Sequence, residues 1–388
     1  MYKRQVRHRG LPVWVRLPGR GPGGAWTDED DRLADRVRRD FAARPADPRA
    51  GWKGLAGDLG RQRLTPLEKP LEGVRHLVVL PSARLAGIPV ETLADRFTVS
   101  YAPSGTMFAW LQEKPRVAGS EPPAVSLLGL GDPVFKPARG GTDRGESFER
   151  LEGTGHELSG VARVFPKAEL LKGPEASERN LDLLVADGRL GRFRYLHFAT
   201  HGVVDDQRPL RSALILARDA LPDPLERVLH GKEVYDGRLT AERILRRWKL
   251  DAELVTLSAC RTGLGQYSGG EGYVGFSQAL FLAGARSLVL SLWEVDDAAT
   301  ALLMTRFYEN LIGTPEGAVR PMPKAEALAE AKRWLRGLGP DEVQQLTKDL
   351  PTRGTRGKIV KKAAAAKAVP GYEHPYYWSG FVLVGDPR

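Results

Sequence analysis

Short apolar runs alternate along the chain with segments whose apolar positions have helical spacing. The runs that predict buried strands are 74–80, 125–131, 194–199, 212–217, 254–258, 287–292 and 381–384. The segments that predict helices are 27–41, 52–61, 157–165, 177–186, 240–248, 275–283, 297–311 and 324–335. Continuous apolar strands separated by helices favour an α/β protein with a mostly parallel sheet covered on both faces. In such a sheet the ligand site lies outside the carboxyl ends of the strands.

The alternation tightens after residue 150, which predicts a division of the chain into two lobes. We assign about 11–150 to an N-terminal lobe and about 151–387 to a catalytic lobe. Residues 1–10 are basic and have no apolar region typical of a secretory signal. The run 11–17 alternates like a strand but has no strand before it to pair with, so we expect that residues 1–10 are an artefactual or truncated start. The polar, glycine-rich segment 136–148 is expected to be a loop.

Composition narrows the classes of function. The chain of 388 residues carries a single cysteine, which excludes an internal disulfide and favours a reducing, cytoplasmic compartment. No apolar stretch approaches the roughly 18 residues that a membrane span needs. The net charge of +10 is concentrated in 1–20 and 352–368, which we interpret as solvated faces and not as a nucleic-acid site, because no nucleic-acid-binding motif accompanies the charges. The glycine-rich run 263–275 lacks the ending of a phosphate loop, and no metal-ligand spacing is present, so we predict no cofactor and no metal.

Two of the predicted strands end in residues that can do chemistry. One ends at Cys260, and the other leads to His201 followed by Gly202, which allows close backbone approach. A lone cysteine is more often a small buried apolar residue. The separation of 260 − 201 = 59 residues, however, is close to the roughly 50 by which a caspase histidine precedes its cysteine. We expect the two strands to be adjacent and parallel, which would bring the side chains of His201 and Cys260 together at one edge of the sheet. His197 lies inside the apolar strand and is predicted to be a buried structural histidine.

The motifs around these residues carry a resemblance to a known family. They are HFATHG at 197–202, VTLSACRTGLG at 255–265, SGGEGYVGFSQALFLAGARSLVLSLWEVDDAAT at 268–300 and HPYYWSGFVLVGDP at 374–387. In this order they resemble the CHAT family of caspase-like cysteine peptidases, which is related to caspases and separases. The resemblance implies a three-layer αβα sandwich, with an N-terminal pseudo-caspase lobe before the catalytic one.

The resemblance also implies roles for single residues. Cys260 would be the nucleophile, and His201 the general base that later protonates the leaving amine. The backbone amides of Gly202 and Cys260 would stabilise the oxyanion. No third catalytic residue is evident, and backbone groups could orient the imidazole instead.

The sequence leaves two roles open for the acids that could select the substrate. In the separase branch an acid of the corresponding loop receives a basic P1 side chain, and the matching residues are Glu294, Asp296 and Asp297. The alternative for Asp296 or Asp297 is capping of the helix that follows. The expected partner is a protein substrate, with helical-repeat or other regulatory regions that this chain does not contain. A catalytically silent caspase-like interaction module is the alternative function.

Overall fold

The structure is a computed structural model that describes most of the chain. The described residues are 3–6, 12–45, 51–81, 83–113, 126–135, 148–218, 221–259, 275–314, 318–348, 350 and 371–388. The predicted loop 136–148 is therefore described only at Phe148, and the basic segment 352–368 lies outside the described residues.

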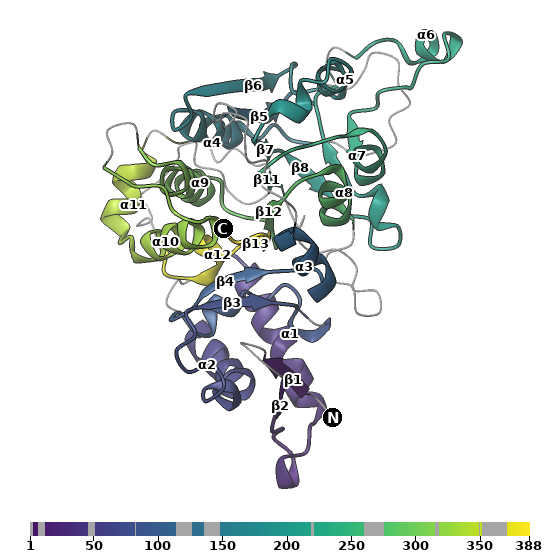
Figure 1. Ribbon diagram of the computed structural model, residues 1–388. Helices are drawn as coiled ribbons and strands as arrows, with labels where there is room; N and C mark the ends of the chain where they lie inside the picture. Colours follow the sequence, from purple (N-terminus) through teal and green to yellow (C-terminus); the bar gives the residue numbers. More distant parts are fainter. Residues whose placement is uncertain are drawn as a thin grey trace.

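An eight-stranded sheet forms the centre of the molecule (Figure 1). Its strands, in spatial order, are β3 (His76–Val79), β4 (Thr98–Tyr101), β13 (Phe381–Gly385), β12 (Ser287–Ser291), β11 (Leu254–Ser258), β7 (Tyr195–Ala199), β5 (Ser126–Pro133) and β6 (Lys167–Gly173). All neighbours are parallel except β12 and β13. Every residue of β11, β12 and β13 is buried, as expected for strands covered on both faces. The predicted mostly parallel α/β fold is confirmed.

Helices cover both faces of this sheet (Figure 1). On one face α9 (Asp297–Ile312) packs between α4 (Glu152–Ala162) and α10 (Lys324–Gly337), and on the other α7 (Ala241–Arg247) packs against α8 (Phe276–Ala283). The remaining helices are α1 (Asp28–Ala42), α2 (Trp52–Arg63), α3 (Gly105–Glu113), α5 (Glu178–Ala186), α6 (Pro224–Leu229), α11 (Pro340–Thr347) and α12 (Pro375–Trp378). The apolar pattern did not predict α6, α11 or α12, each of which has proline in its first turn, and it began α4 five residues late.

The strand order connects the two predicted lobes. Strands β3, β4 and β5 precede residue 150, yet β5 lies between β7 and β6, and β4 pairs with β13. Segments on both sides of residue 150 therefore build one sheet, and the division into two lobes stays a prediction. At the start of the chain β1 (Lys3–Val6) pairs antiparallel with β2 (Val13–Arg16), and the expectation of an artefactual start is likewise untested.

A second, small sheet lies beyond the carboxyl end of β7. It consists of β8 (His201–Val203), β9 (Ala213–Ile215) and β10 (Arg238–Thr240), antiparallel in the order β10-β9-β8. Only one residue, Thr200, separates β7 from β8. The hydroxyl of Thr200 donates to the carbonyl of Ile215, which fastens the turn between the two sheets to β9. The small sheet thus places the His201 segment at the rim of the central sheet.

Candidate active site

Two adjacent strands lead to the predicted catalytic residues. β7 and β11 are parallel neighbours in which Tyr195 pairs with Leu254 and Ala199 with Ser258, a constant offset of 59 residues. The amide of Thr200 donates to the carbonyl of Ser258 over 3.3 Å, so the contact continues past the end of β7. The prediction that these two strands lie side by side and parallel is confirmed.

Cys260 itself lies outside the described residues, as does the segment 261–274 that follows it. Ala259 is the last described residue before this segment. Its side chain is 1% exposed, and its carbonyl accepts a hydrogen bond from the hydroxyl of Ser291 in β12. The backbone is thus anchored up to the residue before the cysteine. A contact between His201 and Cys260 stays a prediction.

His201 opens strand β8 and is held by three neighbours. Its Nε2 atom lies 2.7 Å from the carbonyl oxygen of Glu149, and its ring packs against those of Phe135 and Phe148, whose centroids lie 5.3 and 5.4 Å from its own and which also contact each other. A carbonyl oxygen can only accept, so Nε2 carries the proton. In the neutral ring Nδ1 is then the unprotonated nitrogen. Gly202 follows in β8, paired with Leu214.

Sequence reasoning did not find Glu149. Its contribution is a backbone carbonyl, which every residue type possesses, and it reaches His201 across 52 positions in the chain. The apolar walls were missed for a related reason, because Phe135 and Phe148 border a polar loop and belong to no periodic run. No residue pattern could have identified these neighbours without the fold.

His197 is buried, as predicted, and has a different environment. It is 0% exposed; its Nε2 lies 2.8 Å from Oε1 of Glu157, and its Nδ1 lies 3.3 Å from the hydroxyl of Tyr308. That hydroxyl also contacts Oγ1 of Thr256 over 2.9 Å, and burial raises the pKa of Tyr308. Both ring nitrogens of His197 are engaged inside the core, which leaves neither for a substrate at the rim.

The three acids of the predicted substrate pocket have separate surroundings. Asp296 is the N-cap of α9, where its carboxylate accepts from the amide of Ala299 over 3.0 Å and lies 3.4 Å from the guanidinium of Arg44. These are the contacts of the capping alternative. Asp297 is the first residue of α9 and lies against α4, and Glu294 is exposed. A role of these acids in substrate binding is not tested by the structure.

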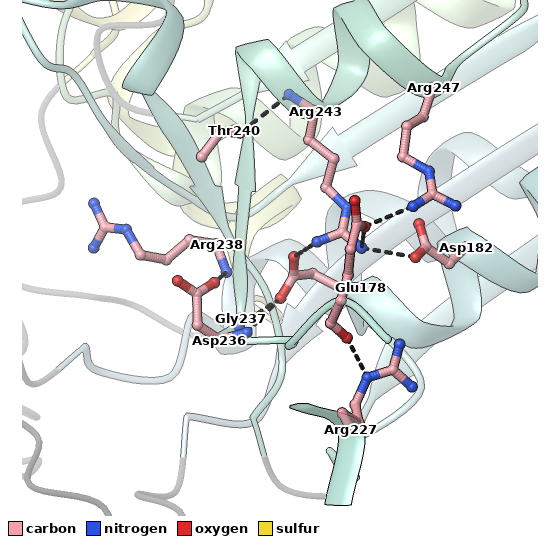
Figure 2. A network of polar contacts seen from close by, with 10 residues as sticks. Glu178, Asp182, Arg227, Asp236, Gly237, Arg238, Thr240, Arg243 and Arg247 are labelled. Atoms are coloured by element: carbon pink, nitrogen blue, oxygen red, sulfur yellow. Dashed lines mark hydrogen bonds and ion pairs between the residues drawn. The ribbon is translucent and has the colours of Figure 1, made fainter. Parts of the chain in front are cut away.

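A network of charged side chains contacts the segment that leads into β10 of the small sheet (Figure 2). Glu178 of α5 is 1% exposed, and its carboxylate accepts from the amides of Asp236 and Gly237 over 2.9 and 2.6 Å. Arg243 of α7 pairs with Glu178 at 3.0 Å and with Asp182 at 2.7 Å. Burial raises the pKa of Glu178, the charge of Asp236 adds to this, and Arg243 opposes it. The network fixes the chain just before β10.

A polar recess of about 600 Å³ borders the small sheet. Val203 of β8 is among its lining residues. The charged residues of the lining are four acids and two arginines, namely Asp205, Asp206, Asp236, Glu242, Arg211 and Arg238. Within the described residues no group of three or more histidine, cysteine or acidic side chains could hold a metal ion. Nor does that part of the chain contain a helix of the length and hydropathy needed to cross a membrane.

The fold and the geometry at the sheet edge define an α/β protein with a mostly parallel sheet, in which the neighbouring strands β7 and β11 lead to a histidine and to a lone cysteine. The CHAT domain family model matches residues 53–386, which is most of the chain. The chain belongs to the CHAT domain family, and the resemblance inferred from its motifs is confirmed.

Solved structures show more distant similarity. A chain of the Saccharomyces cerevisiae separase–securin complex aligns with a TM-score of 0.45 and 13% identity, over 80% of this chain and 16% of that one. The Arg-specific cysteine proteinase gingipain R aligns with a TM-score of 0.45 and 10% identity, over 93% of this chain and 75% of that one. The chain thus spans about a sixth of the separase-complex chain. No curated protein sequence matches it. Similarity at this level carries no argument about activity.

Proposed function

We propose that the protein is a cysteine endopeptidase in which His201 and Cys260 act as a catalytic pair. The observation that carries the proposal is the pairing of β7 with β11 at an offset of 59 residues, the same number that separates His201 from Cys260. Cys260 is bonded to the anchored Ala259, and consecutive Cα atoms are about 3.8 Å apart. The described chain therefore reaches, at Ala259, the same edge of the sheet at which β7 leads to His201.

The contact to Glu149 assigns the proton positions in this mechanism. With Nε2 donating to the carbonyl, Nδ1 of His201 takes the proton of the Cys260 thiol. The thiolate attacks the peptide carbonyl carbon, and the amides of Gly202 and Cys260 stabilise the oxyanion. The imidazolium then protonates the leaving amine, and a thioester remains. Water activated by the same imidazole hydrolyses the thioester and regenerates the thiol.

The proposed chemistry also suggests where the protein works. Only a thiolate attacks, and oxidation would remove it, so the single cysteine must stay reduced. We therefore propose a reducing compartment such as the cytoplasm and a polypeptide as substrate, with no cofactor. Regulatory partners are proposed on the resemblance alone.

A silent interaction module is the alternative function, and thiol reactivity separates the two. We expect an iodoacetamide-type probe to label Cys260 rapidly in the wild type and much more slowly in His201→Ala. His230→Ala is the matched control, because that histidine is exposed and lies in the α6 region. Equal labelling of all three proteins would favour the silent module, since an unactivated thiol needs no histidine.

Proteolysis tests the proposal directly. We expect Cys260→Ala to abolish cleavage of a peptide library while its far-UV circular dichroism and melting temperature stay those of the wild type. Cleavage at the wild-type rate by Cys260→Ala would exclude this cysteine as nucleophile. The comparison requires equal protein concentrations and a reducing buffer, so that oxidation does not imitate the substitution.

We further propose a preference for arginine or lysine at P1, supported by the acids near the site. Glu294 is exposed, whereas Asp296 already caps α9 and pairs with Arg44, so Glu294 is the acid most open to a substrate cation. A library in which cleavage occurs only after aspartate would contradict this preference. Glu294→Gln should lower kcat/KM for peptides with P1 arginine more than for those with P1 leucine.

A further inference from the structure

We propose that Asp132 and Arg150 are positioning residues that hold the Glu149 carbonyl against His201. The inference rests on the proposed function for its catalytic consequence, and its structural part stands on the described contacts alone. Glu149 orients the imidazole through its backbone, so whatever fixes that stretch of backbone also fixes the histidine. Arg150 is the next residue in the chain, and its side chain is the first anchor.

The guanidinium of Arg150 forms a two-point contact with Asp132. The Nε atom of Arg150 donates to Oδ1 of Asp132 over 2.8 Å, and its Nη2 atom donates to Oδ2 over 2.7 Å. Such a planar fork constrains direction as well as distance, which a lysine cannot do. Hydrogen bonding to Asp132 raises the pKa of Arg150, in accord with a close pair. The Asp132 side chain is 13% exposed and the Arg150 side chain 55%, so Asp132 is the more firmly packed partner and restrains Arg150.

The backbone of Asp132 is held in a conformation that most residues avoid. It has φ of 50°, the one positive value recorded for a residue other than glycine in the described part of the chain. Aspartate tolerates this left-handed region better than most residues do, and such backbones tend to occur at functional sites. The amide of Asp132 donates to the hydroxyl of Thr154 over 2.8 Å. The irregularity between Gly131 and Pro133 near the end of β5 therefore presents the carboxylate toward Arg150 with little freedom.

Thr154 provides a second connection to the same stretch of chain. Its hydroxyl donates to the carbonyl of Leu151 over 2.6 Å while it accepts from the amide of Asp132. The chain around Arg150 is thus tied to Asp132 through a side chain and again through Leu151. Neither tie belongs to the helical hydrogen bonding of α4, so both add to the restraint on the preceding carbonyl.

The anchor and the histidine share one frame of reference. Gly131 pairs with Ala199 across β5 and β7, so Asp132 directly follows a residue fixed to the strand that leads to His201. Three contacts thus connect β7 back to its own histidine. Strand β7 pairs with β5, Asp132 of β5 binds Arg150, and the carbonyl of Glu149, the residue before Arg150, binds the imidazole of His201. Loosening any member leaves His201 free to turn or to adopt the other tautomer, in which Nδ1 carries the proton and cannot act as base.

Two conservative substitutions test the inference. Arg150→Lys keeps the charge but loses the fork, and Asp132→Asn keeps the shape and the tolerance of positive φ but loses half of the acceptor capacity. We expect kcat to fall about 10- to 100-fold with KM changed less than about threefold, as for a small misplacement of a catalytic group. Arg189→Lys is the control, because Arg189 is a similarly exposed arginine paired with Glu169 at 2.5 Å on β6.

A spectroscopic readout keeps this test independent of peptidase activity. In protein labelled with ¹⁵N-histidine, the ring N–H of His201 should give a hydrogen-bonded proton resonance at Nε2, assigned by its loss in His201→Gln. We expect Arg150→Lys and Asp132→Asn to weaken or shift this resonance while Arg189→Lys leaves it unchanged. An unchanged resonance and kcat in the first two variants, or an equal effect in the control, would overturn the inference. If the wild type lacks activity but shows these shifts, the proposed function fails and the positioning contact stands.

Discussion

Replacing Arg243 by methionine should destabilise the support of the small sheet. Glu178 is almost wholly buried and would keep its charge without its ion-pair partner, which costs about 3–5 kcal/mol for a buried pair. The amides of Asp236 and Gly237 would still donate to that carboxylate, so we expect the lower end of this range, about 3 kcal/mol. The loss of the pairing with Glu233 adds less, because Glu233 is 57% exposed and water screens its charge. Asp182, which is 14% exposed, also loses its partner.

The same perturbation predicts a pH dependence with a definite sign. The folded-state pKa of Glu178 is raised above its ordinary value of 4.5, chiefly by burial, and Arg243 limits the rise. A carboxyl with a raised folded pKa binds its proton more tightly when folded, so it destabilises the protein as pH increases through that window. Without Arg243 the pKa rises further. Arg243→Met should therefore regain more stability than the wild type between about pH 7 and about pH 5.

Urea denaturation followed by far-UV circular dichroism measures these effects. The informative companion is Glu178→Gln combined with Arg243→Met, because glutamine keeps an acceptor oxygen for the two amides and removes the buried charge. We expect this double variant to recover at least about 1 kcal/mol relative to Arg243→Met alone. A double variant no more stable than the single one, or a single variant that loses under about 1 kcal/mol, would refute the reasoning.

Three further substitutions follow from single contacts. Tyr308→Phe should cost about 1–3 kcal/mol, because it removes the hydroxyl that serves two buried polar groups; a loss below about 0.5 kcal/mol in urea would contradict this. Gly275→Ala should cost more than about 1 kcal/mol, since φ is 104° and the new methyl would meet the Pro209 carbonyl oxygen at 3.0 Å; an unchanged melting temperature would count against it. Asp296→Ala should cost about 1 kcal/mol through its bond to the Ala299 amide, measured in the same assay, and Asp296→Asn, which can still cap, should cost less.

The fold class was predictable because buried parallel strands leave a clear pattern. A strand covered on both faces is mostly apolar, and β7, β11, β12 and β13 show this as runs interrupted only by a few buried polar residues. Helix starts were predictable for a similar reason, since Ser177 and Thr240 accept from amides of the first turn as their sequence context suggests. Three-residue strands such as β8 and β10 and the short helix α6 lie below the length at which periodicity is informative.

The order of strands, by contrast, is not written in any local pattern. The last strand, β13, lies in the middle of the sheet between β4 and β12. Strand β5 lies beside β7, although 61 residues lie between the end of β5 and the start of β7. Such pairings depend on how distant surfaces pack, and many orders are compatible with one apolar pattern. The neighbouring positions of β7 and β11 were anticipated only because each ends near a reactive residue.

For the candidate site, the sequence by itself determined the residue types: one cysteine, a histidine followed by glycine, and motifs sufficient to place the chain in its family. Only the tertiary structure decided which nitrogen of His201 carries the proton, because that depends on the Glu149 carbonyl. It also decided that Asp132 and Arg150 meet, and that Asp296 caps α9. Backbone groups and pairs distant in sequence carry no signature of their own; their chemistry arises from distance and direction, which exist only once the chain has folded.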